Sequence, residues 1–194
     1  MNNKIILSPA QKALKINLDN TIYGSFVEIG AGQEVAHNFF KVGSASGTIA
    51  KTMSAYDKDF SDAIYGKEEN DRYVCKERLA NMLEKEYDLL EERLDRKDHK
   101  NVRFFAFADT VATINFDKTI KGHGWIGLRF QLTSDQKPSN FIIHVHLNDQ
   151  DAQLQQETIG IIGANLMHAC FNELDPKKML KSILLQIVIS IKIN

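Results

Sequence analysis

The chain has 194 residues, of which 43% are hydrophobic and 25% charged, and its formal net charge is −1. These values are typical of one globular domain and give no electrostatic case for binding nucleic acid or an acidic membrane surface. The first residues lack the apolar core of a signal peptide, and no apolar run is long enough for a transmembrane helix, so we expect a cytoplasmic protein. Cys75 and Cys170 stand far apart and predict free thiols.

The first predicted elements lead into a glycine turn. Ser8 and Pro9 mark the start of a short helix that ends near Leu18. Residues 26–29, apolar except for Glu28, predict a buried strand. The helix expected over 33–40 places Val35, Phe39 and Phe40 on one face.

The later elements predict the fold class. We expect a helix over 76–97, strands over 102–108, 125–132 and 140–147, and a second long helix over 149–173. The last two strands are close enough in sequence to form a hairpin, and strands that follow one another without a helix argue against strict β-α-β alternation. The sequence therefore predicts an α+β fold, with a mostly antiparallel or mixed central sheet covered by two long amphipathic helices.

The domain is expected to span residues 1–175. Pro176 begins another helical turn, and the rest of the segment 176–194 is dense in isoleucine. Two interpretations of this segment stay open: an aberrant or truncated C-terminal tail, and a genuine final strand, which would be prone to aggregation if its edge were exposed.

The stretch from Ser25 to Gly66 holds the candidate ligand-binding residues. A strand, a glycine turn and a helix N-terminus together can bind an anion. The string E-I-G-A-G resembles the first motif of S-adenosylmethionine-dependent methyltransferases, but Glu34 replaces its third glycine, and Val35 breaks the dinucleotide pattern G-x-G-x-x-G. Lys51 does not follow a glycine as a phosphate loop requires. The alternative is that these small residues serve tight turns and close helix packing. The candidate cofactor-binding residues are Gly30, Gly32, Gly47, Thr48, Lys51, Ser54 and Asp57.

The same stretch carries a family resemblance, through EIGAGQEVA at 28–36, GTIAKTMSAYD at 47–57 and SDAIYG at 61–66, with RYV following at 72–74. On these motifs the chain resembles the N-terminal half of an uncharacterised cytosolic family of bacteria. The resemblance covers roughly residues 20–172 and continues through FAFADTVA, HGW, IHVH and GIIG.

Members of that family bear two conflicting names, nicotinate-nucleotide adenylyltransferase and TonB-dependent receptor. The first name implies a nucleotidyltransferase, but its S-x-T-x-x-R motif is absent, and the nearest match to its (H/T)-x-G-H motif lies mid-chain at 120–123 with the wrong first residue. The second name requires a signal peptide and many alternating amphipathic strands, and the sequence offers neither.

Several polar residues on the later strands suggest chemistry. Asp109 ends a phenylalanine-rich strand, where open α/β sheets place working residues. His144 and His146 are two apart on a strand and therefore leave the same face, so with Asp109 and His123 they could bind Zn²⁺, Mn²⁺ or Fe²⁺. A mid-strand arginine, Arg129, could bind a carboxylate or phosphate with both arms of its guanidinium group. The candidate catalytic residues are Asp109, His123 and Arg129, and the candidate metal ligands are His144 and His146.

Two functions stay open. The first is an enzyme or binding protein for a nucleotide or phosphate ligand, with a divalent metal as the candidate cofactor and a pocket that combines the glycine turn, Asp109 and the histidines. The second is a non-catalytic subunit or assembly domain that self-associates through a face covered, in its relatives, by the C-terminal half. We favour the first, because short runs rich in Ser, Thr, Asp and His are poorly suited to packing alone.

Overall fold

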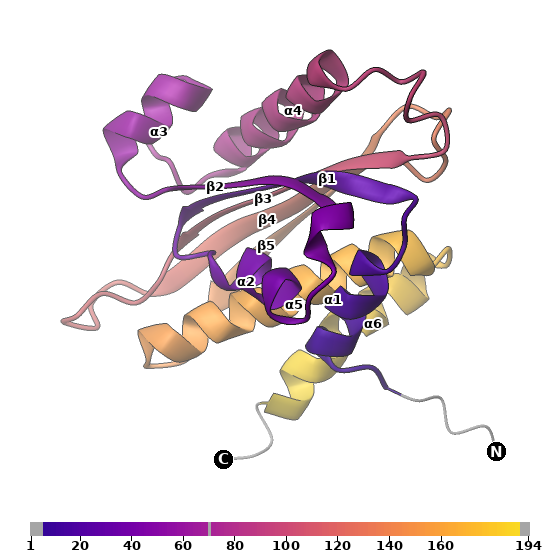
Figure 1. The fold of residues 1–194 in the computed structure, drawn as a ribbon. Helices are drawn as coiled ribbons and strands as arrows, with labels where there is room; N and C mark the ends of the chain where they lie inside the picture. Colours follow the sequence, from indigo (N-terminus) through magenta and orange to yellow (C-terminus); the bar gives the residue numbers. More distant parts are fainter. Residues whose placement is uncertain (1–5, 70, 191–194) are drawn as a thin grey trace.

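A five-stranded mixed sheet forms the centre of the protein (Figure 1). The computed structural model describes residues 6–69 and 71–190, with side chains through 184. The strands run in the spatial order β2-β1-β3-β4-β5. Their bounds are β1 Ile22–Gly30, β2 Ile49–Ala55, β3 Arg103–Ala112, β4 Gly122–Phe130 and β5 Ser139–Leu147. β1 pairs in parallel with β2 and β3, whereas β3, β4 and β5 are antiparallel, so the predicted mixed sheet and hairpin are confirmed.

Helices cover both faces of the sheet and complete a three-layer α+β fold. In Figure 1, α3 and α4 lie above the sheet, and the other α-helices lie below it. The upper helices are α3 Lys58–Tyr65 and α4 Lys76–Arg93. The lower ones are α1 Pro9–Asn17, α2 Glu34–Lys41, α5 Ala152–Asn172 and α6 Pro176–Ser190, and a 3₁₀ turn spans Ala45–Gly47. The two predicted long helices, α4 and α5, therefore lie on opposite faces.

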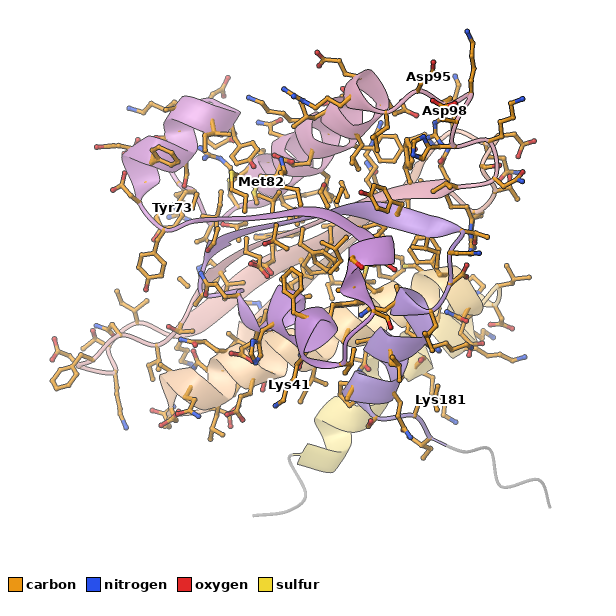
Figure 2. All side chains as sticks on the ribbon, in the orientation of Figure 1. Lys41, Tyr73, Met82, Asp95, Asp98 and Lys181 are labelled. Atoms are coloured by element: carbon orange, nitrogen blue, oxygen red, sulfur yellow. The ribbon has the colours of Figure 1, made fainter. Side chains whose placement is uncertain are left out.

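The alternation of side chains along β3 builds two cores. Phe105, Phe107 and Val111 point into the larger core, which α1, α2 and α5 close. Phe104, Ala106 and Ala108 point the other way, toward α4. Met82 of α4, labelled in Figure 2, is fully buried in this second core. Because both faces are covered, the central strands β1 and β3 are buried along almost their whole length and are mostly apolar, as expected for buried strands with parallel neighbours.

α5 is apolar on almost every side because it lies between the sheet and three other helices, as its contacts with α1, α2 and α6 show. Gly160 and Gly163 let α2 come close to α5. A Cβ atom at Gly163 would lie 2.5 Å from Val35, and one at Gly160 would lie 2.8 Å from Asn38 and Glu34.

The C-terminal segment is helical over Pro176–Ser190, so the interpretation of that part as a final strand is wrong. Residues 191–194 lie outside the described part of the chain. Ile183 is buried, and two buried polar side chains connect this helix to the rest: the Lys12 ammonium donates to the Ser182 carbonyl at 3.1 Å, and the Asn165 amide donates to the Ile183 carbonyl at 3.0 Å. The division at residue 175 stays a prediction.

Three local expectations need correction. No strand is predicted over residues 49–55, where β2 forms, because only its two end residues are buried. The first long helix ends at Arg93 rather than 97, and Phe40 is half exposed instead of facing the core. Gly66 is the C-cap of α3, with φ at +85°, a conformation that favours glycine.

A buried arginine joins α4 to α3 and to the loop 66–75. The Arg78 side chain is completely buried and forms ion pairs with Asp62 and Glu68, the latter at 3.2 Å. It also donates a hydrogen bond of 2.7 Å to the Gly66 carbonyl. These contacts fix the loop against the first turn of α4.

We predict that Arg78→Met lowers the free energy of unfolding by about 3–5 kcal/mol, because it leaves two largely buried carboxylates without their cation. Urea denaturation followed by circular dichroism measures this loss. Arg93→Met, at the exposed end of the same helix, is the matched control and should change stability by less than about 0.5 kcal/mol. Equal losses in both variants would contradict the structural role of Arg78.

Candidate ligand-binding groove

A groove of about 540 Å³ opens on the α4 side of the sheet, where β4 begins and β5 ends. One side is formed by residues 72–77, which lead into α4, and the other by the exposed ends of β4 and β5. Its lining residues are Arg72, Val74, Cys75, Lys76, Glu77, Lys121, Gly122, His123, Trp125, His144 and His146. A second hollow of about 500 Å³ shares Arg72, Val74 and His123 and adds Lys58 and Tyr73, so the two are neighbours. Tyr73, labelled in Figure 2, lies at the end of the sheet beside α3.

Three imidazoles and one indole share the floor of the groove. His123 pairs with His146, and Trp125 pairs with His144, across the antiparallel β4–β5 ladder. The Trp125 and His144 rings are stacked, with centroids 4.3 Å apart and planes 10° from parallel. The His144 ring centroid lies 4.5 Å from that of His146 and 5.7 Å from that of His123. The predicted shared face of His144 and His146 is thus confirmed.

Cations outnumber acids in this groove. Arg72, Lys76 and Lys121 line it, against the single carboxylate of Glu77. Lys76 and Lys121 are exposed and have no ion-pair partner among the side chains that the structure describes. Lys58 of the neighbouring hollow is instead paired with Asp71 at 2.7 Å. The groove therefore has a local positive potential although the chain as a whole is almost neutral.

The environment keeps two of the histidines neutral at pH 7. The pKa of His123 is lowered by burial and then by the charges of His146 and Arg72. The pKa of His144 is lowered by burial and then by His146 and His123. Below the usual range of histidine these rings take up protons, so the groove becomes more positive as the pH falls.

Asp109 does not join the histidines. It pairs with Ile126 on β4, so its side chain lies on the α5 face, whereas Trp125 and His123 leave the α4 face. The sequence places these residues at one end of the sheet but does not show which face each occupies.

Arg129 shares the α4 face of β4 with His123 but lies six residues away, about 20 Å along a strand. It donates to the Asn140 amide oxygen at 3.2 Å, and its guanidinium carbon lies 5.3 Å from the centre of the Tyr87 ring. Of the three candidate catalytic residues, only His123 lines the groove.

The candidate cofactor-binding residues divide into two sets. Gly30, Gly32, Ser54 and Asp57 follow or end the parallel strands, and the Gln33 amide links two of them by donating to the Gly30 carbonyl and to the Ser54 hydroxyl. Asp57 caps α3 by accepting from the Phe60 amide at 2.8 Å.

The second set lies toward the start of β2. Gly47 is exposed before the strand, and Thr48 donates to the Asn17 carbonyl at 3.2 Å. Lys51 forms a 2.5 Å ion pair with Glu86 of α4. These three residues therefore do not form one site with Gly30 and Gly32.

Within the described part of the chain, no group of three or more His, Cys, Asp or Glu side chains is arranged to hold a metal ion. Metal binding by His144 and His146 stays a prediction. Lys76, Lys121 and Trp125 line the groove although they are not among the predicted site residues. Lys121, two residues before the H-G-W motif, is the signal in the sequence that points to this lining.

The comparisons with solved structures support the fold. The structure resembles a competence-damaged protein (CinA) superfamily protein from Enterobacter cloacae, with a TM-score of 0.61, 9% sequence identity, and coverage of 89% of this chain and 97% of that one. A competence or damage-inducible protein from Enterobacter asburiae gives a TM-score of 0.61 at 11% identity, covering 86% and 99%. A CinA superfamily protein from Escherichia coli gives 0.57 at 12% identity, covering 86% and 96%. At these identities the likeness concerns the fold alone.

No family model matches the sequence, and no curated protein matches it. Among the described residues, none of the helices is both long enough and apolar enough to span a bilayer.

Zinc titration tests the predicted metal site. If His144 and His146 bind zinc, free Zn²⁺ at 100 times its dissociation constant should stabilise the protein by about 2.7 kcal/mol, and EDTA should reverse the effect. His146→Ala should abolish both the stabilisation and the bound zinc measured by atomic emission. His37→Ala, an exposed histidine on α2, is the control. Equal zinc contents in His146→Ala and the wild type would exclude this site.

Proposed function

We propose that the protein binds a small anionic molecule with a planar ring, of the nucleotide type, in the groove between residues 72–77 and the β4–β5 hairpin. The observation that carries this proposal is the gathering of Arg72, Lys76 and Lys121 beside three histidines, with one opposing carboxylate. A phosphate or carboxylate is the complementary ligand, because guanidinium and ammonium groups form charge-assisted hydrogen bonds with such oxygens.

The ring component of the ligand follows from Trp125 and His144. Their rings are stacked, and His144 is exposed, so a planar ligand can extend the stack over the outer face of the imidazole. Stacking on an aromatic side chain is worth about 1–3 kcal/mol per base in nucleic-acid complexes. An aromatic phosphate would use both the stack and the cations, whereas a simple sugar phosphate would use only the cations.

The position of the groove agrees with this proposal. It lies at the end of the sheet where β1, β2 and β3 finish, and ligands of open α/β sheets bind beyond the carboxyl ends of the strands. The family resemblance points to a nucleotide only through the name adenylyltransferase, and the sequence motifs of that enzyme are absent. We propose binding rather than a particular reaction, because Asp109 and Arg129 lie away from His123.

Self-association is a second candidate function. The loop between β3 and β4 carries Phe116, which is 99% exposed, and Ile120, which is 58% exposed. Contiguous patches of exposed apolar side chains mark interaction surfaces, and this loop exposes two large apolar side chains four residues apart. Sedimentation equilibrium should then give a dimer or larger species that Phe116→Ser dissociates. A wild-type protein that remains monomeric over a 100-fold range of concentration would exclude this function.

Fluorescence of Trp125 tests the ligand class directly, because Trp125 is the only tryptophan of the chain. We predict saturable quenching by AMP and by nicotinate mononucleotide, weaker binding of ribose 5-phosphate, and still weaker binding of adenosine. Lys121→Ala should weaken AMP binding about three- to fivefold, the effect of a partly exposed ion pair worth about 0.7–1 kcal/mol. Lys100→Ala, another exposed lysine, is the control.

Two results would contradict the proposal. If adenosine binds as tightly as AMP, the cations do not recognise the ligand. If none of these compounds changes the emission of Trp125, the groove is not a site for this class of molecule.

The pH dependence of binding provides an independent test. Because the pKa values of His123 and His144 are lowered by burial and by neighbouring charges, both rings are neutral at pH 7.5 and gain charge as the pH falls. Affinity for an anion of fixed charge, such as an aromatic sulfonate, should therefore rise several-fold between pH 7.5 and pH 5.5. His144→Ala should reduce this rise, and an affinity independent of pH would show that the histidines do not face the ligand.

A further inference from the structure

Two acidic residues lie side by side inside the larger core. Glu28 of β1 pairs with Asp109 of β3 in the parallel ladder, so both side chains leave the same face of the sheet. That face carries Phe26 and Phe107 and is covered by α2 and α5. Glu28 is 3% exposed and Asp109 is not exposed at all. Water therefore does not reach the Asp109 carboxyl group, and it reaches that of Glu28 only slightly.

The pair has almost no compensating partner. Glu28 accepts one hydrogen bond, from the Ala36 amide of α2 at 3.1 Å. Neither carboxyl oxygen of Asp109 has a hydrogen-bond partner among the described residues. A buried carboxylate without a cation or a set of donors costs several kcal/mol, whereas the protonated acid costs far less.

The charges on the surrounding elements do not change this conclusion. Glu34 of α2 adds a further negative charge near Glu28, while His37 and Lys41 of the same helix are exposed. Lys51 of β2 pairs with Glu86 on the other face of the sheet, and the α5 residues 159–167 carry no charge. On β4, the residue beside Asp109 is Ile126.

The pKa values of both carboxyl groups are raised, as their burial predicts. Burial, followed by the charge of Glu34, raises the pKa of Glu28 to about 7 against the opposing hydrogen bond from Ala36. Burial and then the charge of Glu28 raise the pKa of Asp109 well above its ordinary value. Both carboxyl groups therefore keep their protons to a higher pH than exposed carboxyl groups do.

The glycine turn closes this pair off from solvent. The backbone of Gly32 lies directly against the Asp109 carboxyl group, so closely that a Cβ atom at Gly32 would be 1.8 Å from its Oδ1. The turn is held by the Ala31 amide, which donates to the Val111 carbonyl at 3.1 Å, and by Gly30 with φ at +81°. Movement of this turn would give water a direct route to Asp109.

We propose that Glu28 and Asp109 form a proton-binding site beneath the glycine turn, and that loss of the proton opens the turn between β1 and α2. Ionisation leaves a poorly solvated carboxylate beneath the turn, with Asp109 directly against the Gly32 backbone, and displacement of the turn is the smallest change that hydrates it. The site is independent of the groove, which lies on the opposite face of the sheet.

The stability of the protein against pH tests the site. Both folded-state pKa values are raised, so the stability linked to the pair is fully present below the unfolded pKa near 4 and is lost as the pH rises through the folded pKa. Asp109→Asn keeps the shape of the side chain and removes the proton, so it should raise Tm relative to the wild type by about 5–10 °C at pH 8 and by much less at pH 5. Asp98→Asn is the matched control: Asp98, labelled in Figure 2, is an exposed aspartate after α4, and its removal should leave the pH dependence unchanged.

Hydrogen exchange tests the opening. After correction for the intrinsic rate, protection of the Ala31 and Ala36 amides in the wild type should fall by at least about tenfold between pH 6 and pH 8.5, and Asp109→Asn should retain it. Constant protection of these two amides would overturn the opening of the turn.

The protonation state itself is read from the wild type by ¹³C NMR of labelled aspartate. This measurement is independent of whether the variant folds. An aspartate whose carboxyl ¹³C shift still reports a protonated group at pH 7 supports the site. If the shifts of all aspartates titrate near pH 4, the site is overturned.

Discussion

The parallel pairing of β1 with β3 determines where the polar groups of the protein lie. The ladder runs in register from Ile22 and Arg103 to Gly30 and Val111 without a bulge. Side chains alternate between the two faces, so this one pairing sends Glu28 and Asp109 into the dry core beneath α2, and Thr110 toward the α4 side. The antiparallel β4–β5 hairpin extends the same alternation and brings the histidines to the α4 face. A shift of one residue in either ladder would exchange the two sets.

The two faces therefore provide different chemical environments. The α4 face ends in an open groove, where cations and imidazoles remain in contact with water and are available to a ligand. The opposite face holds the two carboxyl groups away from water beneath a glycine turn. Arg78 connects this arrangement to the helix layer, because its ion pairs hold the loop that supplies Arg72 and Val74 to the groove. Fold and groove thus depend on one buried cation.

Some of this arrangement can be predicted from the sequence. Phe104–Phe107 and Phe141–Ile143 identify their strands because short apolar runs bounded by polar turns are typical of buried strands. The sequence does not predict β2, because its interior residues alternate between exposed and half-buried and form no apolar run, as expected on a sheet edge. The common face of His144 and His146 follows from their spacing alone. The separation of Asp109 from these histidines depends on the register between different strands, which residue types do not reveal. Lys76 and Lys121 line the same groove only because the start of α4 lies beside the start of β4.

The central claim is that the groove, rather than the glycine turn, receives an anionic aromatic ligand. A titration of ¹⁵N-labelled protein with AMP, followed by heteronuclear NMR, distinguishes the two places, since the single tryptophan gives one indole signal. We predict saturable shifts of the Trp125 indole and of the amides of residues 72–77 and 121–125, with the signals of Gly30 and Gly32 unmoved. Shifts confined to Gly30, Gly32 and the first turn of α2, or no shifts at all, would contradict this account.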